Sequence, residues 1–296
     1  MLAGNADSLN LAATCAFSEH EKNLVKLGER AWTERIGALV VLVVIERDEC
    51  QDAPGRKTHV AHVAVRYDLV GGQRAKLVPA EAAGKMQKAG AGFAGFATWL
   101  DLTPAHPDMM AVPDPEAAIQ LPWKKEVAWV ASNCVMEEQP LAQAPRNVLR
   151  RLIDEAAKDG LRVKTGVEPE FFLLSPEGDK ISDPYDNAEK PCYDQQAVMR
   201  RYDVISEACD YMLELGWEAY QNDHEDATGQ YEMNWKYDDV LATADKHSFF
   251  KFMMKSVAEK HGLRATFMPK PFKGLTGSGC HAHISVWSLD GKTNAF

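Results

Sequence analysis

Two histidines and a serine alternate with apolar residues directly after a glycine-rich turn, within residues 277–285. If this segment is a strand, His281, His283 and Ser285 lie on one face, because successive side chains of a strand point to opposite sides. The glycines of the turn, Gly277 among them, would let backbone N–H groups approach a small anion closely. The pattern therefore predicts a strand with one apolar face and one face that can bind a ligand.

An otherwise apolar segment, residues 167–174, carries two acids, Glu168 and Glu170. Because they are two residues apart, both carboxylates share one face of a strand. Like charges placed there repel each other and are costly to desolvate unless a cation lies close to both. A solvated pair on an edge strand is the alternative, but the Phe and Leu residues that follow indicate a buried strand. A bound metal ion is the simpler explanation.

More acids flank a Thr-Gly break in residues 224–235. Glu225 and Glu232 are an odd number of residues apart, so an unbroken strand would send them to opposite faces, whereas a bend at Gly229 could return both to one side. The glutamates and His281 could then converge. Oxygen ligands with one or two imidazoles favour Mg²⁺ or Mn²⁺, since a zinc site would normally recruit thiolates or more histidines.

Four segments of the chain resemble the glutamine synthetase family, in particular its type III-like, gamma-glutamylmethylamide synthetase-like class. They are Val-Glu-Pro-Glu-Phe-Phe-Leu at 167–173, His-Glu-Asp-Ala-Thr-Gly-Gln-Tyr-Glu-Met-Asn-Trp at 224–235, Ala-Thr-Phe-Met-Pro-Lys-Pro-Phe at 265–272 and Gly-Ser-Gly-Cys-His-Ala-His-Ile-Ser at 277–285. These segments occur in the family's order and spacing. The resemblance covers about residues 62–296.

The resemblance implies an α+β fold, in which a small β-grasp-like domain precedes a catalytic domain of curved antiparallel sheet plus helices. We expect an N-terminal extension without a family counterpart at 1–60, the β-grasp-like domain at 61–140 and the catalytic domain at 141–296. The family's downstream arginines and a further glutamate ligand have no counterpart before Phe296. The catalytic domain is therefore expected to be truncated at the C-terminus, and the chain by itself to turn over slowly.

The resemblance also implies a reaction, the ATP-dependent ligation of ammonia to the side-chain carboxylate of L-glutamate through a gamma-glutamyl phosphate. Mg²⁺ or Mn²⁺ would neutralise charge during the phosphoryl transfer. Carried over position by position, the resemblance implies metal ligands near glutamate at Glu170, Glu225 and Glu232, ligands of the metal that bridges the ATP phosphates at Glu168 and His281, nucleotide neighbours at His283 and Ser285, and a glutamate-binding loop at Gly277. Known relatives are ring oligomers, so the complete form is expected to be a homo-oligomer.

One departure from the family bears on the choice of acceptor amine. Ammonia-using members often carry Gly-Phe-Asp-Gly-Ser-Ser, whereas residues 92–97 read Gly-Phe-Ala-Gly-Phe-Ala, which removes a carboxylate at Ala94. An apolar site would suit methylamine or another small amine, although Asp108 is expected to keep part of the ammonium role. Thr276 stands where many members have Asn. A non-catalytic relative that retains only the scaffold is the alternative from another class of protein.

Composition narrows the class of protein further. The net charge of -10 argues against nucleic acid as a partner, because phosphate binding needs clustered Lys and Arg. The 6 cysteines form no Cys-x-x-Cys pair, so we expect reduced thiols and a cytoplasmic protein. The apolar run at 36–45 is too short to span a membrane, and we expect a buried strand there.

Periodic apolar residues predict the elements that must position these groups. We expect helices from Pro145 to about Gly160, near 195–215 with Tyr202 on the buried side, and near 239–261, alternating with the strands that carry the acids. An amphipathic stretch is expected at 19–32. From residue 62 to about 140, short strands should alternate with Gly and Pro turns, including one at 112–115.

Overall fold

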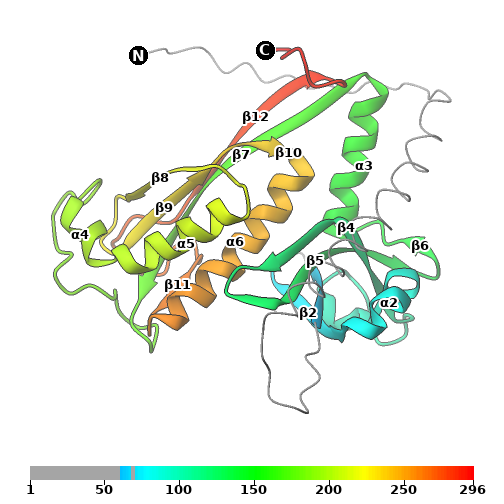
Figure 1. Ribbon diagram of the computed structural model, residues 1–296, viewed down its shortest axis with the longest axis horizontal. Coiled ribbons are helices and arrows are strands. Elements are labelled where there is room, and N and C mark those ends of the chain that lie inside the picture. Colours follow the sequence, from blue (N-terminus) through cyan, green and yellow to red (C-terminus); the bar gives the residue numbers. More distant parts are fainter. Residues whose placement is uncertain (1–60, 68–70) are drawn as a thin grey trace, which may run out of the picture.

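The computed structural model describes residues 61–67 and 71–296, with side chains from Tyr67 onward. The expected extension at 1–60, with its amphipathic stretch at 19–32 and its strand at 36–45, lies outside the described residues. The described part combines two 6-stranded sheets with helices (Figure 1). The predicted α+β fold is confirmed.

The first sheet has the strand order β2-β1-β5-β4-β3, with β6 paired to β5. Its strands are β1 (Ala61–Tyr67), β2 (Gln73–Pro79), β3 (Ala91–Phe93), β4 (Met109–Leu121), β5 (Lys124–Met136) and β6 (Gln139–Pro140). The β1 and β5 strands pair in parallel, and the other pairs are antiparallel. Its short helical elements are η2 (Ala80–Ala82), α2 (Ala83–Ala89) and η3 (Gly95–Thr98). Met86 of α2 packs with Leu100 and Met109 in a small core of this sheet.

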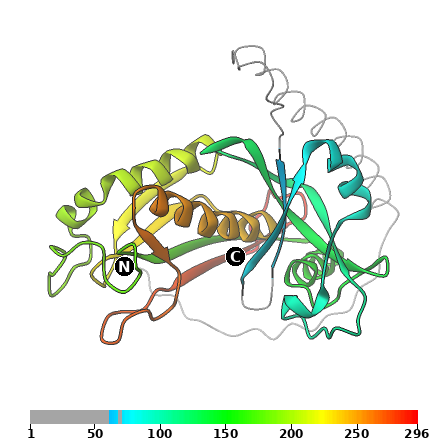
Figure 2. The same cartoon turned by 90° about the horizontal axis from the view of Figure 1, so that it is seen from below.

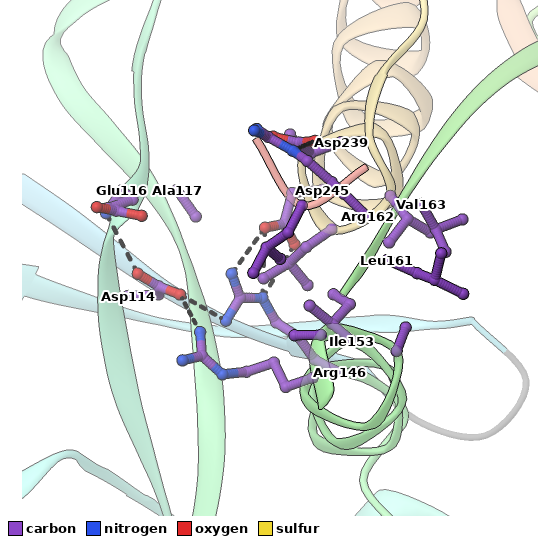
Figure 3. A pocket seen from close by; sticks show the side chains of 17 residues that line it. Asp114, Glu116, Ala117, Arg146, Ile153, Leu161, Arg162, Val163, Asp239 and Asp245 are labelled. Carbon is purple, nitrogen blue, oxygen red and sulfur yellow. Dashed lines mark hydrogen bonds and ion pairs between the residues drawn. The ribbon is translucent and has the colours of Figure 1, made fainter. Parts of the chain in front are cut away.

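The predicted Pro turn at 112–115 is wrong, because these residues lie inside β4. The register of β4 against β5 shifts between Pro113 and Ala118, which marks a bulge. Proline cannot donate a hydrogen bond to a sheet ladder, and a bulge relieves that requirement without ending the strand. The bulge leaves Asp114 pointing toward the helices that pack beside the sheet (Figure 3).

The second sheet is built around one long strand, β7 (Leu161–Leu174). Its other strands are β8 (Ala219–His224), β9 (Gln230–Trp235), β10 (Asp238–Asp239), β11 (Arg264–Thr266) and β12 (Cys280–Ser288). All of them except β8 pair with β7, β8 pairs with β9, and every pair is antiparallel. Figure 1 shows β12 running beside β7 along almost its whole length. The predicted strand at 277–285 therefore exists and begins at Cys280.

Four helices accompany the strands, α3 (Pro145–Lys158), α4 (Gln195–Arg200), α5 (Tyr202–Glu214) and α6 (Val240–Lys260). The predicted first and third helices are confirmed, and Gly160 and Gly262 follow them with φ of 74° and 69°. The predicted helix at 195–215 is two helices, because Arg201 leaves the helical region at φ -117°. This break turns Tyr202 outward, so its side chain is 54% exposed rather than buried. None of the described helices combines the length and hydrophobicity that a membrane crossing needs.

One hydrophobic core joins the two sheets. Trp129 of β5 contacts Phe249 of α6 with ring centroids 5.4 Å apart, and Phe250 contacts Phe171 of β7 at 6.0 Å. Aromatic pairs at these distances prefer edge-to-face arrangements, as both pairs adopt here. Figure 2 shows α6 lying between the second sheet and the strands of the first. The core thereby fixes β7, which carries the candidate ligands, against the rest of the chain.

A buried ion cluster joins the same parts. Arg146 of α3, only 6% exposed, places Nη2 2.8 Å from Oδ2 of Asp245 and Nη1 2.9 Å from Oδ2 of Asp114. Arg150 also reaches Asp114, at 2.9 Å. Figure 3 shows these contacts at the wall of a pocket of about 460 Å³ between β4, α3 and the start of α6. None of the candidate ligands lines this pocket.

Candidate metal centre

Three glutamates from two segments of the sequence meet in the second sheet. Oxygen atoms of Glu170, Glu225 and Glu232 all lie within 4.8 Å of one another. Antiparallel pairing of β7 and β9 sets Glu170 directly opposite Glu232. Glu225 lies in the turn between β8 and β9, where the N–H of Glu225 donates to the carbonyl of Gln230 at 2.9 Å. The anticipated bend is thus a complete hairpin, and it brings Glu225 back to the other two acids.

Gly229 makes this hairpin possible. Its φ of 73° is a left-handed conformation that side-chain-bearing residues rarely adopt. A Cβ atom at this position would also overlap Cγ2 of Ile181. The Thr-Gly break recognised in the sequence therefore has a structural cause in both backbone conformation and packing.

The three carboxylates carry more negative charge than their surroundings balance. Glu232 is only 8% exposed, and burial together with the neighbouring acids raises its pKa to about 7, even though Asn234 donates a hydrogen bond to it. Burial also raises the pKa of Glu225. Within residues 71–296, no Lys or Arg side chain forms an ion pair with any of the three. Three hard oxygen donors with uncompensated charge fit Mg²⁺ or Mn²⁺.

A second group lies beside the first, on the next residues of β7. Glu168 is set opposite His281 by the β7–β12 register. Its Oε2 lies 3.6 Å from Nδ1 of His281, and its Oε1 lies 3.1 Å from Nε2 of His283. Both imidazoles are exposed and share one face of β12, as the alternation predicted. Glu168 and His281 can therefore offer one oxygen and one nitrogen to a second cation.

A pocket of about 570 Å³ opens next to this second group. Glu168 and His283 lie at its wall, together with Tyr220, Trp235 and Tyr237. Its volume falls in the range of sites for small ligands. Acidic and imidazole groups thus line a pocket whose remaining wall is partly aromatic.

The glycine turn before β12 lies directly against the first group. A Cβ atom on Gly279 would stand 2.9 Å from Oε1 of Glu170, and one on Gly277 would stand 2.5 Å from the carbonyl oxygen of Pro269. The carbonyl of Gly279 also accepts a hydrogen bond from the N–H of Glu170 at 3.3 Å. Glycine is required at 277, where the Pro269 backbone occupies the space of a side chain, whereas a side chain at 279 would have to displace the Glu170 carboxylate.

The remaining predicted site residues do not join these groups. The hydroxyl of Ser285 accepts a hydrogen bond from Nε1 of Trp287 at 2.8 Å, farther along β12. Asp108 is exposed at the start of β4 in the first sheet, and Ala94 is exposed next to η3 in the same sheet. Thr276 donates to Asp226 at 2.7 Å. The apolar face predicted for β12 is not covered either, since Ile284 is 61% exposed on this edge strand.

Three polar residues near the acids escaped the sequence reasoning. Asp223 of β8 lies opposite Glu232, and its Oδ1 is buried with no hydrogen-bond partner in the described part of the chain. Nε2 of His224 lies 2.8 Å from Oδ2 of Asp186, and both side chains are fully buried. Burial alone would lower the pKa of His224, but the hydrogen bond and the charge of Asp186 raise it. The carboxylate of Asp186 also accepts the N–H of Gly229, which fastens the hairpin that carries Glu225.

Comparison with known proteins identifies the group to which this architecture belongs. The model of the family "Glutamine synthetase, catalytic domain" matches residues 142–296. The chain is 76% identical over 242 residues to the glutamine synthetase of Rhizobium leguminosarum bv. phaseoli, covering 81% of this chain and 56% of the relative. It is 36% identical over 246 residues to the glutamate–methylamine ligase of Methyloversatilis universalis, covering 81% of this chain and 55% of the relative.

Solved structures give the same result. The structure "Apo GmaS without ligand" superposes with a TM-score of 0.78 at 59% identity, covering 80% of this chain and 56% of that one. The structure "GmaS/ADP complex-Conformation 1" has a TM-score of 0.80 at 56% identity, and the match covers 86% of this chain and 57% of that one. The chain spans about half the length of the curated relatives it matches. Sequence motifs, fold and relatives agree that the chain belongs to the glutamine synthetase family.

Proposed function

We propose that this chain forms the metal-binding part of a glutamine synthetase, which ligates ammonia to the side-chain carboxylate of L-glutamate with ATP, through a gamma-glutamyl phosphate. The observation that carries the proposal is the meeting of Glu170, Glu225 and Glu232 within 4.8 Å. The relatives named glutamine synthetase support the same reaction. A ligase that makes this intermediate must hold two negatively charged reactants together, and an excess of carboxylates that requires cations meets that need.

Two cations would be held by different residues. Glu170, Glu225 and Glu232 would hold the one nearer to glutamate, while Glu168 and His281 would hold the one at the ATP phosphates. When bound, the ions neutralise charge between the carboxylate and the phosphate groups. The chain's own groups fix the spacing of the two positions, because Glu168 and Glu170 project from one face of the same rigid strand. Gly277 would border the glutamate. His283, which lines the pocket, and Ser285 would border the nucleotide.

Calorimetric titration with Mn²⁺ tests this proposal. The chain should bind Mn²⁺, and a Glu170→Ala, Glu232→Ala variant should lose most of the affinity. A Glu155→Gln variant is a matched control, because Glu155 is an exposed acid of α3. Equal affinity in the double variant and the unchanged chain would remove the basis of the proposal.

Methylamine is a second candidate for the acceptor amine, and Ala94 is the observation that favours it. This residue, where ammonia-using relatives carry an acid, is followed by Phe96, which is 58% exposed. One of the relatives is named glutamate–methylamine ligase. A methyl group is worth ~1–3 kcal/mol in an apolar pocket, and loss of a charged partner of the ammonium acts in the same direction. Asp108, on the same sheet, would keep part of the ammonium role.

The two amines can be separated by experiment in the full-length protein. The ratio of kcat/KM for ammonia to kcat/KM for methylamine should rise in an Ala94→Asp variant, at one pH and with saturating ATP and glutamate. An unchanged ratio would show that Ala94 does not line the amine site. Failure of both proteins to release phosphate would instead favour a non-catalytic relative.

Two further parts of the proposal concern the cellular compartment and the oligomeric state. We place the reaction in the cytoplasm, and the free thiols of Cys192, Cys209 and Cys280 agree with a reducing compartment. We also propose a homo-oligomer for the complete protein. Exposed Leu77, Phe96 and Trp99 on the first sheet offer apolar surface for such contacts.

A further inference from the structure

Gln230 is a fully buried polar residue that touches three separate parts of the candidate metal centre. It lies at the start of β9 with 0% exposure. Its Nε2 donates to Oε2 of Glu170 at 2.9 Å, and the same nitrogen lies 3.1 Å from the carbonyl of Gly277 and 3.2 Å from Oγ of Ser278. Its Oε1 accepts the N–H of Ala227 at 3.0 Å. One amide thus connects a candidate metal ligand, the hairpin turn and the glycine turn.

The orientation of this amide is fixed by its partners. Because Oε1 is held by a backbone N–H of the hairpin, the NH₂ group must face Glu170 and the glycine turn. The two N–H groups of this amide face three acceptors, so both of them are hydrogen-bonded. Buried polar groups of this kind are costly to leave unpaired, which keeps Gln230 in one position.

The glycine turn has little freedom to move independently of Glu170. Gly279 lies so close to the Glu170 carboxylate that a side chain there would have to displace it, and the N–H of Glu170 donates to the carbonyl of Gly279. The N–H of Ser278 donates to the carbonyl of Pro269 at 2.8 Å, which anchors the other side of the turn. A change at the Glu170 carboxylate therefore has a direct route to the turn through Gln230.

We infer that Gln230 is a positioning residue that couples cation binding at Glu170 to the ordering of the glycine turn at residues 277–279. The inference rests on the proposed metal site. A cation that binds one oxygen of Glu170 would fix this carboxylate. The other oxygen of Glu170 would still accept the hydrogen bond from Nε2 of Gln230. Hydrogen-bonded partners of metal ligands orient those ligands, and their removal typically weakens metal binding about 10–100-fold. The turn that borders the substrate would consequently be most ordered when the metal is bound.

Hydrogen–deuterium exchange with mass spectrometry, on peptides that cover residues 275–282, tests the coupling with and without saturating Mn²⁺. In the unchanged chain, Mn²⁺ should slow exchange in these peptides. In a Gln230→Met variant, which keeps the length of the side chain but cannot donate, the dissociation constant for Mn²⁺ should rise about 10–100-fold. At a Mn²⁺ concentration that saturates the variant, exchange in the turn should stay as fast as without metal.

Controls separate coupling from a general loss of structure. Gln120→Met changes the same residue type in the first sheet, where Gln120 donates to the carbonyl of Lys125, and should leave both readouts unchanged. If Gln230→Met does not fold, Gln230→Asn keeps the amide but shortens its reach, and the same loss of metal-induced protection is expected.

Each outcome decides a different point. If the unchanged chain binds no Mn²⁺, both the metal site and the coupling are wrong. If it binds Mn²⁺ without protection of the turn, or if the Gln230 variant retains that protection, the metal site stands and the coupling is wrong.

Discussion

Replacing Glu232 by Gln should stabilise the metal-free protein while removing its affinity for metal. Glu232 is buried beside other acids, and its pKa is raised from 4.5 to about 7. Between these values the folded protein binds more protons than the unfolded chain, so its stability falls as the pH rises. Above pH 7 the full cost of the ionised, buried carboxylate is present. Gln keeps the oxygen that accepts from Asn234 at 2.9 Å and carries no charge.

The size of the effect follows from the displacement of the pKa. One pKa unit corresponds to ~1.36 kcal/mol, so a rise from 4.5 to about 7 gives an upper value near 3 kcal/mol. The remaining 8% exposure of Glu232 lets solvent screen part of this cost, so we expect a gain of ~1–3 kcal/mol. Bound metal acts in the opposite direction, since a ligand at 100 times its dissociation constant stabilises the unchanged chain by ~2.7 kcal/mol.

Urea denaturation in EDTA measures this directly. At pH 8 the free energy of unfolding of Glu232→Gln should exceed that of the unchanged chain, and the difference should narrow as the pH is lowered toward 5. Adding Mn²⁺ at pH 8 should raise the stability of the unchanged chain alone. A variant that is equally or less stable than the unchanged chain in EDTA at pH 8 would refute the reasoning about the buried charge.

Three further substitutions test other parts of the structure. Burial alone would raise the pKa of Glu207, but hydrogen bonds from Lys260, Tyr211 and His261 lower it to about 2. Glu207→Gln should therefore lower the free energy of unfolding by ~1–3 kcal/mol at pH 7, as measured by urea denaturation. This difference between the two proteins should disappear as the pH falls from 4.5 to 2. Arg146→Met should cost ~3–5 kcal/mol because it leaves the buried Asp245 without its cationic partner and removes one of the two arginines that contact Asp114; a midpoint of urea denaturation equal to that of the unchanged chain would contradict this. Gly229→Ala should lower both the melting temperature and the Mn²⁺ affinity, because the left-handed turn that carries Glu225 cannot accept a Cβ atom; normal affinity would show that the turn adapts.

Local periodicity was sufficient to predict much of this protein. The apolar spacing and terminal glycines of α3 and α6 identify both helices, because a helical stripe and its stop signal are properties of a short segment. The shared face of Glu168 and Glu170, and that of His281 and His283, follows from strand alternation in the same way. The family motifs supplied the predicted grouping of ligands, and the β7 pairings set Glu170 opposite Glu232 and Glu168 opposite His281.

What could not be predicted depends on contacts between distant segments. The residues at 112–115 have the composition of a turn, and only pairing with β5 makes them a bulged strand. Tyr202 fits the helical stripe, but the break at Arg201 changes the phase of that stripe. Gln230 shares the face of Glu232 by alternation, so strand periodicity could have marked it; its four contacts, however, come from three segments far apart in the sequence.

The candidate site departs from the rule that buried charges are paired. Between the first sheet and the helices, by contrast, the buried Arg146 is paired with Asp114 and Asp245. Around Glu232, carboxylates gather without a cationic side chain among the described residues, and an oxygen of Asp223 is buried without a partner. Such an arrangement opposes folding of the metal-free chain, so it persists only where something outside the chain offsets its cost. The proposed divalent cation would supply that offset, and it would tie the stability of this sheet to its proposed chemistry.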